Sequence, residues 1–445
     1  MKKDFDIAIV GGGPAGSTAA NLLSQAGLSV IILEKEQFPR PHVGESLLPF
    51  CYDIFQKLGV LEEMEKRFSR KPGAIFCDKN NDAATTYCFK HVVENPKHLS
   101  FHVRRDEFDL MLLETAETKG AVVCQNTRVL NTNLNEDIAT LNCKSEKGSF
   151  DIRCKFVLDA SGRDGLIARQ NNWRTPSPDL DRIAFHSYWT FKTTPTDIKL
   201  GMIRIIYLDD EKKGWIWCIP VAEDKISIGL VVDQKSLGQE RKKYKGSNWQ
   251  QDFYMHEIFS SNYLKSELAD AERDDKIWVN GDYSYSSKTK YGTNFSMIGD
   301  SGQFIDPIFS SGVFIAMKSA ELVAEVLPNY LNSSDIKILD KVYSTISDGY
   351  ETVGELINLY YNPNILDFSS VGNHNDINNE RYDEFKSAYS LLHYLLAGDF
   401  FERGHIYKNF FKELKDGRKF ERWQNLVNWE SNESGVFYSK NENCL

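Results

Sequence analysis

One stretch, residues 6–34, constrains the fold of this chain more than any other. An apolar run at residues 6–10 leads into Gly-Gly-Gly-Pro-Ala-Gly at residues 11–16, then a helical pattern over residues 17–26, then a second apolar run at residues 27–34. The first run is too short for a buried helix and ends in glycines, so the sequence predicts strand, tight turn, helix and strand. The predicted class is therefore α/β.

The glycine spacing predicts a dinucleotide site in this unit. Gly11 permits the turn, Gly13 lets backbone approach a pyrophosphate, and Gly16 lets the helix pack closely on the strand. The helix start offers free N–H groups and a positive dipole end to phosphates, and the acid that ends the second strand is placed to accept a ribose hydroxyl. The alternative is a glycine-rich turn in another kind of α/β unit. The residues predicted to bind the cofactor here are Gly11, Gly13, Pro14, Ala15, Gly16 and Glu34.

The bulk composition excludes several classes of protein. A chain of 445 residues predicts about two or three domains, and 41% hydrophobic with 26% charged residues is typical of a soluble globular protein. A net charge of -10 argues against nucleic acid as a partner. No apolar run approaches the roughly 18 residues of a membrane span, and the chain enters a charged strand soon after Met1, so neither a span nor a signal peptide is expected.

The cysteine pattern predicts reduced thiols in a cytoplasmic protein. The eight cysteines are scattered and form no CxxC pair, which favours neither a disulfide framework nor a metal site. They are Cys51, Cys77, Cys88, Cys124, Cys143, Cys154, Cys218 and Cys444.

A segment after the first unit resembles one group of flavoproteins. Gly44-Glu45-Ser46-Leu-Leu-Pro, at residues 44–49, is similar to the Gly-Glu-Ser/Thr-x-x-Pro segment of the p-hydroxybenzoate hydroxylase fold, in its halogenase and geranylgeranyl reductase branches. The resemblance implies FAD as the cofactor. It also implies contacts from Arg105 at a helix start, Asp159 in a strand-to-glycine turn, and the Gly299-Asp300 pair on the ribityl chain. The alternatives are a helix cap at Ser46 and a surface salt bridge at Arg105.

The chain beyond these motifs predicts a second, antiparallel sheet. Short alternating strands at residues 203–208, 214–221 and 226–232 are separated by charged turns, so a sheet that covers the flavin is expected over about residues 175–280. The expected FAD-binding domain is residues 1–174, with a substrate-side excursion at about 70–100, and it returns at residues 281–330. Residues 331–445 are expected to be helical, with aromatic pairs in the core.

The string Gly214-Trp215-Ile216-Trp217-Cys218-Ile219-Pro220 resembles the Trp-x-Trp-x-Ile-Pro motif of flavin-dependent halogenases. In a strand, Trp215, Trp217 and Ile219 share one face, so two indoles and a branched chain form a continuous wall. Such a wall keeps an organic substrate from the flavin while a small oxidant passes along it. The alternative is a packed aromatic strand, because geranylgeranyl reductases carry a related strand.

The segment from Phe304 to Val313 resembles the halogenase Phe-x-x-Pro-x-x-Ser-x-Gly segment, which contains Pro307 here. The resemblance implies that the backbone N–H groups of Ser311 and Gly312 hold a halide at a helix start, where the dipole favours an anion. It also implies that Pro307, Gly312 and Val313 contact the flavin. An ordinary serine cap is the competing interpretation.

Lys71, just before a Pro-Gly turn, lies where halogenases have their catalytic lysine. An ammonium there would hydrogen-bond hypohalous acid, or a desolvated amine would become a haloamine. Alone, a lysine beside an arginine is usually a solvated charge. His102 and His186 are weak candidates for a substrate-side base. Asp282 resembles a covalent FAD tether of one branch, which is not expected here.

Together these resemblances imply an FADH2-dependent halogenase that uses O2 and chloride or bromide on an electron-rich aromatic ring. Tryptophan halogenases have a glutamate where this chain has Phe309, and they are longer, which favours the phenol or pyrrole branch. The implied partners are a separate flavin reductase and an aromatic substrate, free or tethered to a carrier protein. An aromatic monooxygenase, a geranylgeranyl-type reductase and a flavin-binding protein without turnover remain open.

Overall fold

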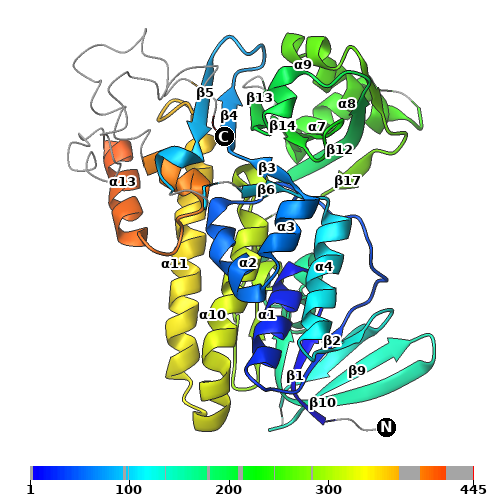
Figure 1. The fold of residues 1–445 in the computed structure, drawn as a ribbon, viewed down its shortest axis with the longest axis vertical. Coiled ribbons are helices and arrows are strands. Elements are labelled where there is room, and N and C mark those ends of the chain that lie inside the picture. The colour runs from blue at the N-terminus through cyan, green and yellow to red at the C-terminus, as the bar shows by residue number, and fades with distance from the viewer. Residues whose placement is uncertain are drawn as a thin grey trace.

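The computed structural model describes residues 4–93, 97–98, 100–135, 137–177, 181–208, 214–244, 246–281, 284–369, 391–416 and 444. Two large sheets and a set of long helices make up the described chain (Figure 1). None of the described helices combines the length and hydropathy that a membrane-spanning segment needs. Asp282, which resembles the covalent FAD tether of one branch, lies outside the described ranges.

The first sheet has the strand order β7-β2-β1-β10-β9-β8, with β19 paired to β10. Its members are β1 (Asp4–Val10), β2 (Val30–Leu33), β7 (Val122–Cys124), β8 (Arg128–Asn133), β9 (Ala139–Ser145), β10 (Gly148–Asp159) and β19 (Phe295–Met297). Strands β1 and β2 pair in parallel and flank α1 (Pro14–Gln25), so the predicted strand–helix–strand unit and the α/β class are confirmed. Helix α4 (Arg105–Thr118) and helix α10 (Ser311–Ser333) pack beside α1 (Figure 1).

The second sheet has the order β16-β12-β15-β14-β13-β4-β5, with β17 paired to β12. Its strands are β4 (Gly73–Cys77), β5 (Ala84–Cys88), β12 (Arg182–Phe191), β13 (Ile203–Tyr207), β14 (Trp215–Pro220), β15 (Lys225–Asp233), β16 (Ala271–Arg273) and β17 (Trp278–Asn280). Strands β12 to β15 pair antiparallel, whereas β13 pairs in parallel with β4, from the 70–100 excursion. The excursion thus extends the second sheet.

Helices cover the outer face of this sheet, although the sequence predicted only strands over residues 175–280. They are α7 (Gln234–Glu240), α8 (Trp249–Phe259) and α9 (Asn262–Glu267). Phe253 and Ile258 of α8 pack with Ile216 and Cys218 of β14 in one buried cluster. Alternation therefore sends Ile216 and Cys218 outward to these helices and the two tryptophans of the strand inward.

Two long helices, α10 and α11 (Lys337–Tyr360), run side by side after the cofactor motifs (Figure 1). Helix α10 begins at Ser311 and continues through Pro328, because the proline lies near its end and interrupts only the last turns. Helix α13 (Gly404–Asp416) packs on α11. Residues 370–390 and 417–443 lie outside the description, so the predicted helical end is tested only in part.

Shorter elements complete the described chain. They are η1 (Pro49–Cys51), α2 (Tyr52–Leu58), α3 (Leu61–Arg67), β3 (Ser69–Lys71), η2 (Phe89–His91), β6 (Ser100–His102), η3 (Gly162–Asp164), α5 (Leu166–Gln170), β11 (Arg174–Pro176), α6 (Thr196–Lys199), η5 (Arg241–Lys243), β18 (Tyr285–Ser287), η6 (Gly299–Ser301), β20 (Gln303–Phe304) and η7 (Pro307–Phe309).

The cysteines differ from the sequence prediction. Cys88 at the end of β5 forms a disulfide with Cys444, and the two are separated by 356 residues. The prediction of all-reduced thiols was wrong for this pair, because spacing along the chain does not show which distant cysteines meet in the fold. The other six cysteines form no disulfide, and five of them are buried.

Candidate active site

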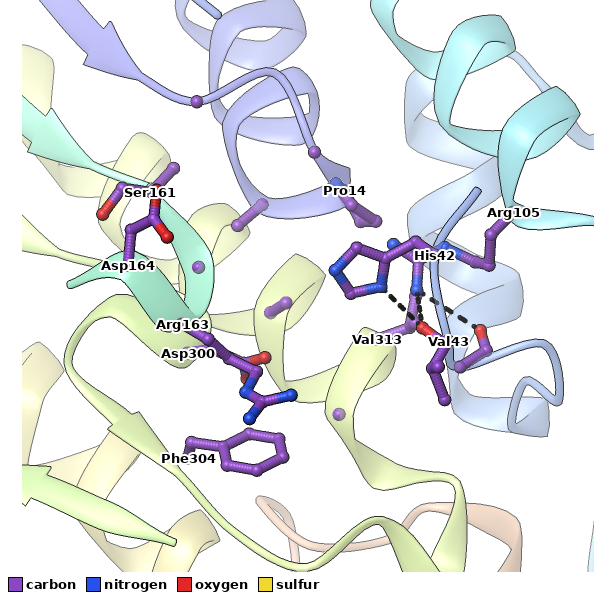
Figure 2. Close-up of a pocket in the computed structure, with 18 of the residues that line it drawn as sticks. Pro14, His42, Val43, Arg105, Ser161, Arg163, Asp164, Asp300, Phe304 and Val313 are labelled. Atoms are coloured by element: carbon purple, nitrogen blue, oxygen red, sulfur yellow. Dashed lines mark hydrogen bonds between the residues drawn. The ribbon is translucent and has the colours of Figure 1, made fainter. Parts of the chain in front are cut away.

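An elongated cavity of about 840 Å³ lies between the two sheets. One wall comes from the glycine turn after β1, a second from the loop at residues 40–46, and a third from β13 and β14 of the second sheet. Figure 2 shows Pro14 at the start of α1 facing the cavity, with His42, Val43 and Arg105 on one side and Arg163, Asp300 and Phe304 on the other. The volume is within the range of cofactor cavities.

The glycine turn is shaped for close approach of backbone. Gly11 has φ +102, and a Cβ there would lie 2.4 Å from the carbonyl oxygen of Ala160. A Cβ on Gly16 would lie 2.0 Å from the carbonyl oxygen of Gly11, so α1 packs directly on the turn. Gly11 and Gly13 line the cavity, whereas Gly16 lies behind it. The first N–H groups of α1 therefore face the cavity without side chains in the way.

Glu34 lies at the end of β2, where its side chain lines the cavity and is 4% exposed. Its carboxylate accepts hydrogen bonds from the backbone N–H of Gly12 at 2.7 Å and of Glu36 at 2.8 Å. These bonds fix the carboxylate beside the turn, and each oxygen retains further lone pairs for a ribose hydroxyl.

Arg105 joins the 40–46 loop to α4. It donates to both oxygens of Asp109, at 2.8 and 2.9 Å, and to the carbonyl of Val43 at 2.5 Å. Gly44 has φ +103, and a Cβ there would lie 2.9 Å from Arg105 Nη1, so only glycine fits. The guanidinium lines the cavity and also fixes the loop that carries Glu45 and Ser46.

The two predicted aspartates occupy different places. Asp300 lines the cavity, and burial raises its pKa to about 6 against the opposing effect of Arg163 and Arg105. Asp159 is fully buried and does not line the cavity. Its two oxygens accept from the backbone N–H of Ser161 at 3.0 Å and of Ile167 at 2.8 Å, so it shapes the adjoining loop.

The indoles of β14 form the wall on the side of the second sheet. Trp215, Trp217 and Ile219 line the cavity together, while Pro220 does not. The two indole centroids are 5.7 Å apart. A Cβ on Gly229 of β15 would lie 2.0 Å from the Trp217 ring, so the indole lies flat over this glycine. The nucleotide turn and the paired tryptophans thus share one cavity.

The predicted halide segment begins α10. Ser310 has φ 57, and no side chain caps the helix, so the first N–H groups lack an intrahelical partner. Gly312 and Val313 line the cavity, and a Cβ on Gly312 would meet nothing within 4 Å. Ser311 does not line the cavity, and its buried hydroxyl has no hydrogen-bond partner.

Lys71 lies outside the cavity, at the end of β3, and is 2% exposed. Its amine donates to the carbonyl of Leu47 at 2.8 Å and lies 5.3 Å from the Phe89 ring centre. Burial lowers the pKa of Lys71 to about 7. The stretch Ser46–Leu47 separates the amine from the cavity, since Ser46 lines it. His102 is buried nearby, and its Nε2 donates to the carbonyl of Gly201 at 2.8 Å.

Glu45 is a buried carboxyl that touches both the cofactor loop and the second sheet. It is 3% exposed and accepts a hydrogen bond from Tyr188 Oη at 2.5 Å. Burial raises the pKa of Glu45 to about 7, and hydrogen bonds from Tyr188 and Ser227 offset only part of this effect. The folded protein therefore binds this proton more tightly than the unfolded chain between pH 4.5 and about 7.

Replacing Glu45 by glutamine is expected to flatten the pH dependence of stability. In the wild type, the Glu45 carboxyl does not lower the free energy of unfolding below pH 4.5. As pH rises from 4.5 to about 7, its ionisation lowers the free energy of unfolding by roughly 3 kcal/mol. Urea unfolding of flavin-stripped protein at pH 5 and pH 8 measures the difference. Glu62→Gln, at an exposed i,i+4 pair, is the control and should behave as wild type. An unchanged pH dependence in Glu45→Gln would contradict the assignment.

Some cavity residues were not singled out from the sequence. His42, in the loop before Gly44, and Arg163, in η3, both line the cavity. The Arg163 guanidinium lies 5.0 Å from the ring centre of Phe304, the first residue of the predicted halide segment, which also lines the cavity. The predicted site residues that do not line the cavity are Gly16, Lys71, Asp159, Gly299, Ser311 and Pro220. Gly299 instead packs on α10, where a Cβ would lie 3.0 Å from Ala316.

The residues present fit FAD. A backbone cradle at Gly11 and Gly13 suits a pyrophosphate, Glu34 suits a ribose, and the apolar wall of β13 and β14 suits a flat ring system. Within the described chain, no cluster of three or more His, Cys, Asp or Glu side chains is arranged to hold a metal ion.

Comparison with known proteins agrees with this geometry. Residues 4–345 match the FAD binding domain family. The chain is 32% identical over 387 residues to the 1H-pyrrole-2-carbonyl-(peptidyl-carrier protein) chlorinase of Pseudomonas fluorescens, covering 82% of this chain and 85% of that protein. It is 37% identical over 325 residues to a tryptophan 2-halogenase of Chondromyces crocatus, covering 72% of this chain but only 60% of that longer protein.

Solved structures give the same result. The flavin-dependent brominase Bmp2 aligns with a TM-score of 0.78 at 25% identity, covering 94% of this chain and 100% of that one. The flavin-dependent halogenase CmlS aligns with a TM-score of 0.70 at 28% identity, covering 94% of this chain and 72% of that one. The chain therefore belongs to the flavin-dependent halogenase family and uses FAD as its cofactor.

Proposed function

We propose that this enzyme halogenates an electron-rich aromatic ring of the phenol or pyrrole type with chloride or bromide. The observation that carries the proposal is the shared cavity, which is lined both by the glycine turn and by the indoles of Trp215 and Trp217. An acceptor ring that approaches from beyond the indoles is kept from the cofactor, while a molecule as small as hypohalous acid is not.

The overall reaction balances as FADH2 + O2 + halide + H⁺ + ArH giving FAD + ArX + 2 H2O. O2 is the oxidant: it accepts two electrons from the reduced flavin and two from the halide, which becomes hypohalous acid, and one water is released. Attack of the ring on the halogen then forms the C–X bond, breaks the C–H bond and releases the second water. The chain contributes binding, separation of the two steps and placement of the oxidant.

Named residues take separate roles in this proposal. The free N–H groups at the start of α10, at Ser311 and Gly312, bind the halide. Trp215, Trp217 and Ile219 shape the passage, and Pro220 ends the strand that carries them. The Lys71 amine lies outside the cavity behind Ser46 and Leu47, and hypohalous acid that passes this stretch would be held there or would convert the amine to a haloamine. The pKa of about 7 leaves a large fraction of the amine neutral near pH 7. A neutral amine has the lone pair that this conversion needs.

The substrate can be free or tethered to a carrier protein. The Pseudomonas fluorescens relative acts, by its name, on a pyrrole carbonyl held by a peptidyl-carrier protein, and it aligns over most of both chains. A separate flavin reductase would supply FADH2, a partner that the family resemblance implies, and the βαβ unit of the first sheet would hold the FAD.

The test is the mass of the product. Purified enzyme would be given FADH2, O2, chloride or bromide, and phenols and pyrroles in free and carrier-tethered form. We expect a product that carries the halogen isotope pattern and depends on halide. A gain of one oxygen without halide would instead indicate a monooxygenase, reduction of a double bond without O2 a reductase, and a flavin that stays reduced in air a binding protein. Each of these outcomes would overturn the proposal.

A further inference from the structure

The indole N–H groups of the two wall tryptophans both donate hydrogen bonds, one partly buried and one buried. Trp215 Nε1 donates to the hydroxyl of Tyr361 at 3.0 Å, and that hydroxyl donates to Asp306 Oδ2 at 2.8 Å. Asp306 is fully buried, and its other oxygen accepts from the backbone N–H of Ile308 at 3.1 Å. Trp215 is therefore connected through one hydroxyl to a carboxylate that begins η7.

Trp217 has an equivalent connection. Its Nε1 donates to Ser227 Oγ at 3.2 Å. Ser227 is fully buried and hydrogen-bonds the carboxyl of Glu45, which also accepts from Tyr188. Both indoles thus follow one scheme, in which the N–H reaches a hydroxyl and the hydroxyl reaches a buried carboxyl.

Both carboxyls belong to segments that line the cofactor cavity. Glu45 lines it directly, and Asp306 precedes Pro307, which lines it. A buried carboxyl is costly unless it is hydrogen-bonded, so these two groups hold their hydroxyl partners firmly. Arg182 supports the first connection, because its guanidinium lies 4.5 Å from the Tyr361 ring centre and pairs with Asp233 at 2.6 Å.

We propose that Tyr361 and Ser227 are positioning residues that fix the two indoles relative to the cofactor loops. The inference rests on the proposed halogenation, for which the indoles form the barrier. β14 fixes the backbone of each tryptophan but not the rotation of the indole about its side-chain torsions. A single N–H bond selects one rotation, and the connection to Glu45 or Asp306 relates that rotation to the loops that contact the cofactor.

Tyr361 and its neighbour Tyr360 form a matched pair for the test. Tyr360 is buried one residue earlier, stacks on Tyr207 with centroids 4.5 Å apart, and has a hydroxyl without a hydrogen-bond partner. Tyr361→Phe and Tyr360→Phe each remove one buried phenolic oxygen, but only the first breaks the connection to Trp215. Ser227→Ala tests the second indole independently if Tyr361→Phe folds poorly.

The experiment measures halogenated product per FADH2 consumed, together with FAD affinity and near-ultraviolet circular dichroism of the indoles. We expect Tyr361→Phe to lower the product ratio by on the order of tenfold, the worth of one hydrogen bond to a charged acceptor. FAD affinity should be unchanged, and the indole signal should change. Tyr360→Phe should match wild type in all three. In a Trp215→Phe background, Tyr361→Phe should lower the product ratio no further.

The outcomes separate this inference from the proposed function. If wild type makes no halogenated product, the function fails, and the indole signal alone decides whether Tyr361 positions Trp215. If wild type is active and Tyr361→Phe matches Tyr360→Phe in product ratio and in indole signal, the positioning role is overturned. An equal further loss in the Trp215→Phe background would also overturn it.

Discussion

Replacing Lys71 by methionine is expected to abolish halogenation while making the protein more stable. The amine is 2% exposed and hydrogen-bonds only the Leu47 carbonyl among its described contacts, and burial lowers its pKa from 10.5 to about 7. A shift of that size corresponds to on the order of 4 kcal/mol against the charged form at neutral pH and below. Leaving the carbonyl unpaired costs about 1–3 kcal/mol, so a net gain of up to about 3 kcal/mol is expected.

The lowered pKa of Lys71 also makes the free energy of unfolding depend on pH. The unfolded chain binds this proton more tightly than the folded protein between pH 7 and 10.5, so wild-type stability rises with pH over that interval. Lys71→Met should lack this rise. Urea unfolding at several pH values and product mass at constant FADH2 oxidation measure the two effects, with Lys66→Met at an exposed ion pair as control. Halogenation by Lys71→Met would exclude the proposed role of the amine.

Replacing Gly229 by alanine is expected to displace Trp217 and uncouple flavin oxidation from halogenation. A Cβ at this position would lie 2.0 to 2.3 Å from three carbons of the indole, which lies over the strand and cannot yield without leaving Ser227. Overpacking of this kind costs about 1–3 kcal/mol. With the indole moved, hypohalous acid escapes and the product per FADH2 falls by at least about tenfold, the equivalent of one lost hydrogen bond.

Gly238→Ala is the matched control for this substitution. Gly238 lies on α7, is exposed, and a Cβ there would meet nothing within 4 Å, so alanine should be neutral or stabilise by up to about 1 kcal/mol. In Gly229→Ala combined with Trp217→Phe, the smaller ring relieves the clash. The free energy of unfolding should recover while the product ratio stays low. A Gly229→Ala enzyme with a wild-type product ratio would show that Trp217 does not set the barrier.

The parts of the fold that local patterns determine could be predicted from the sequence. The unit of β1, α1 and β2 depends on glycine spacing and apolar runs within thirty residues, and β14 places Trp215 and Trp217 on one face because strand side chains alternate. The helices at residues 234–267 were missed. Helices α7 and α9 are short and each bury one residue, Leu237 and Leu264, which shows no period. Helix α8 does bury residues 253, 254, 257 and 258 at helical spacing, a signal that the sequence interpretation overlooked.

Contacts between distant segments could not be predicted. Tyr361 hydrogen-bonds Trp215, which is 146 positions away in the chain, and Asp306, which is 55 positions away. The sequence interpretation assigned the aromatic residues of this region only to the core. The Cys88–Cys444 disulfide was missed for the same reason. Asp159 carries the expected motif, yet its oxygens are occupied by backbone N–H groups that only the folded loop brings to them.

The place of Tyr361 at the end of α11 has an evolutionary consequence. The FAD binding domain match ends at residue 345, so the residue that orients one barrier indole lies beyond the part of the chain that recognises the cofactor. Exchange of C-terminal segments between relatives would therefore change the residue that holds the Trp215 indole and leave the matched portion, residues 4–345, unchanged.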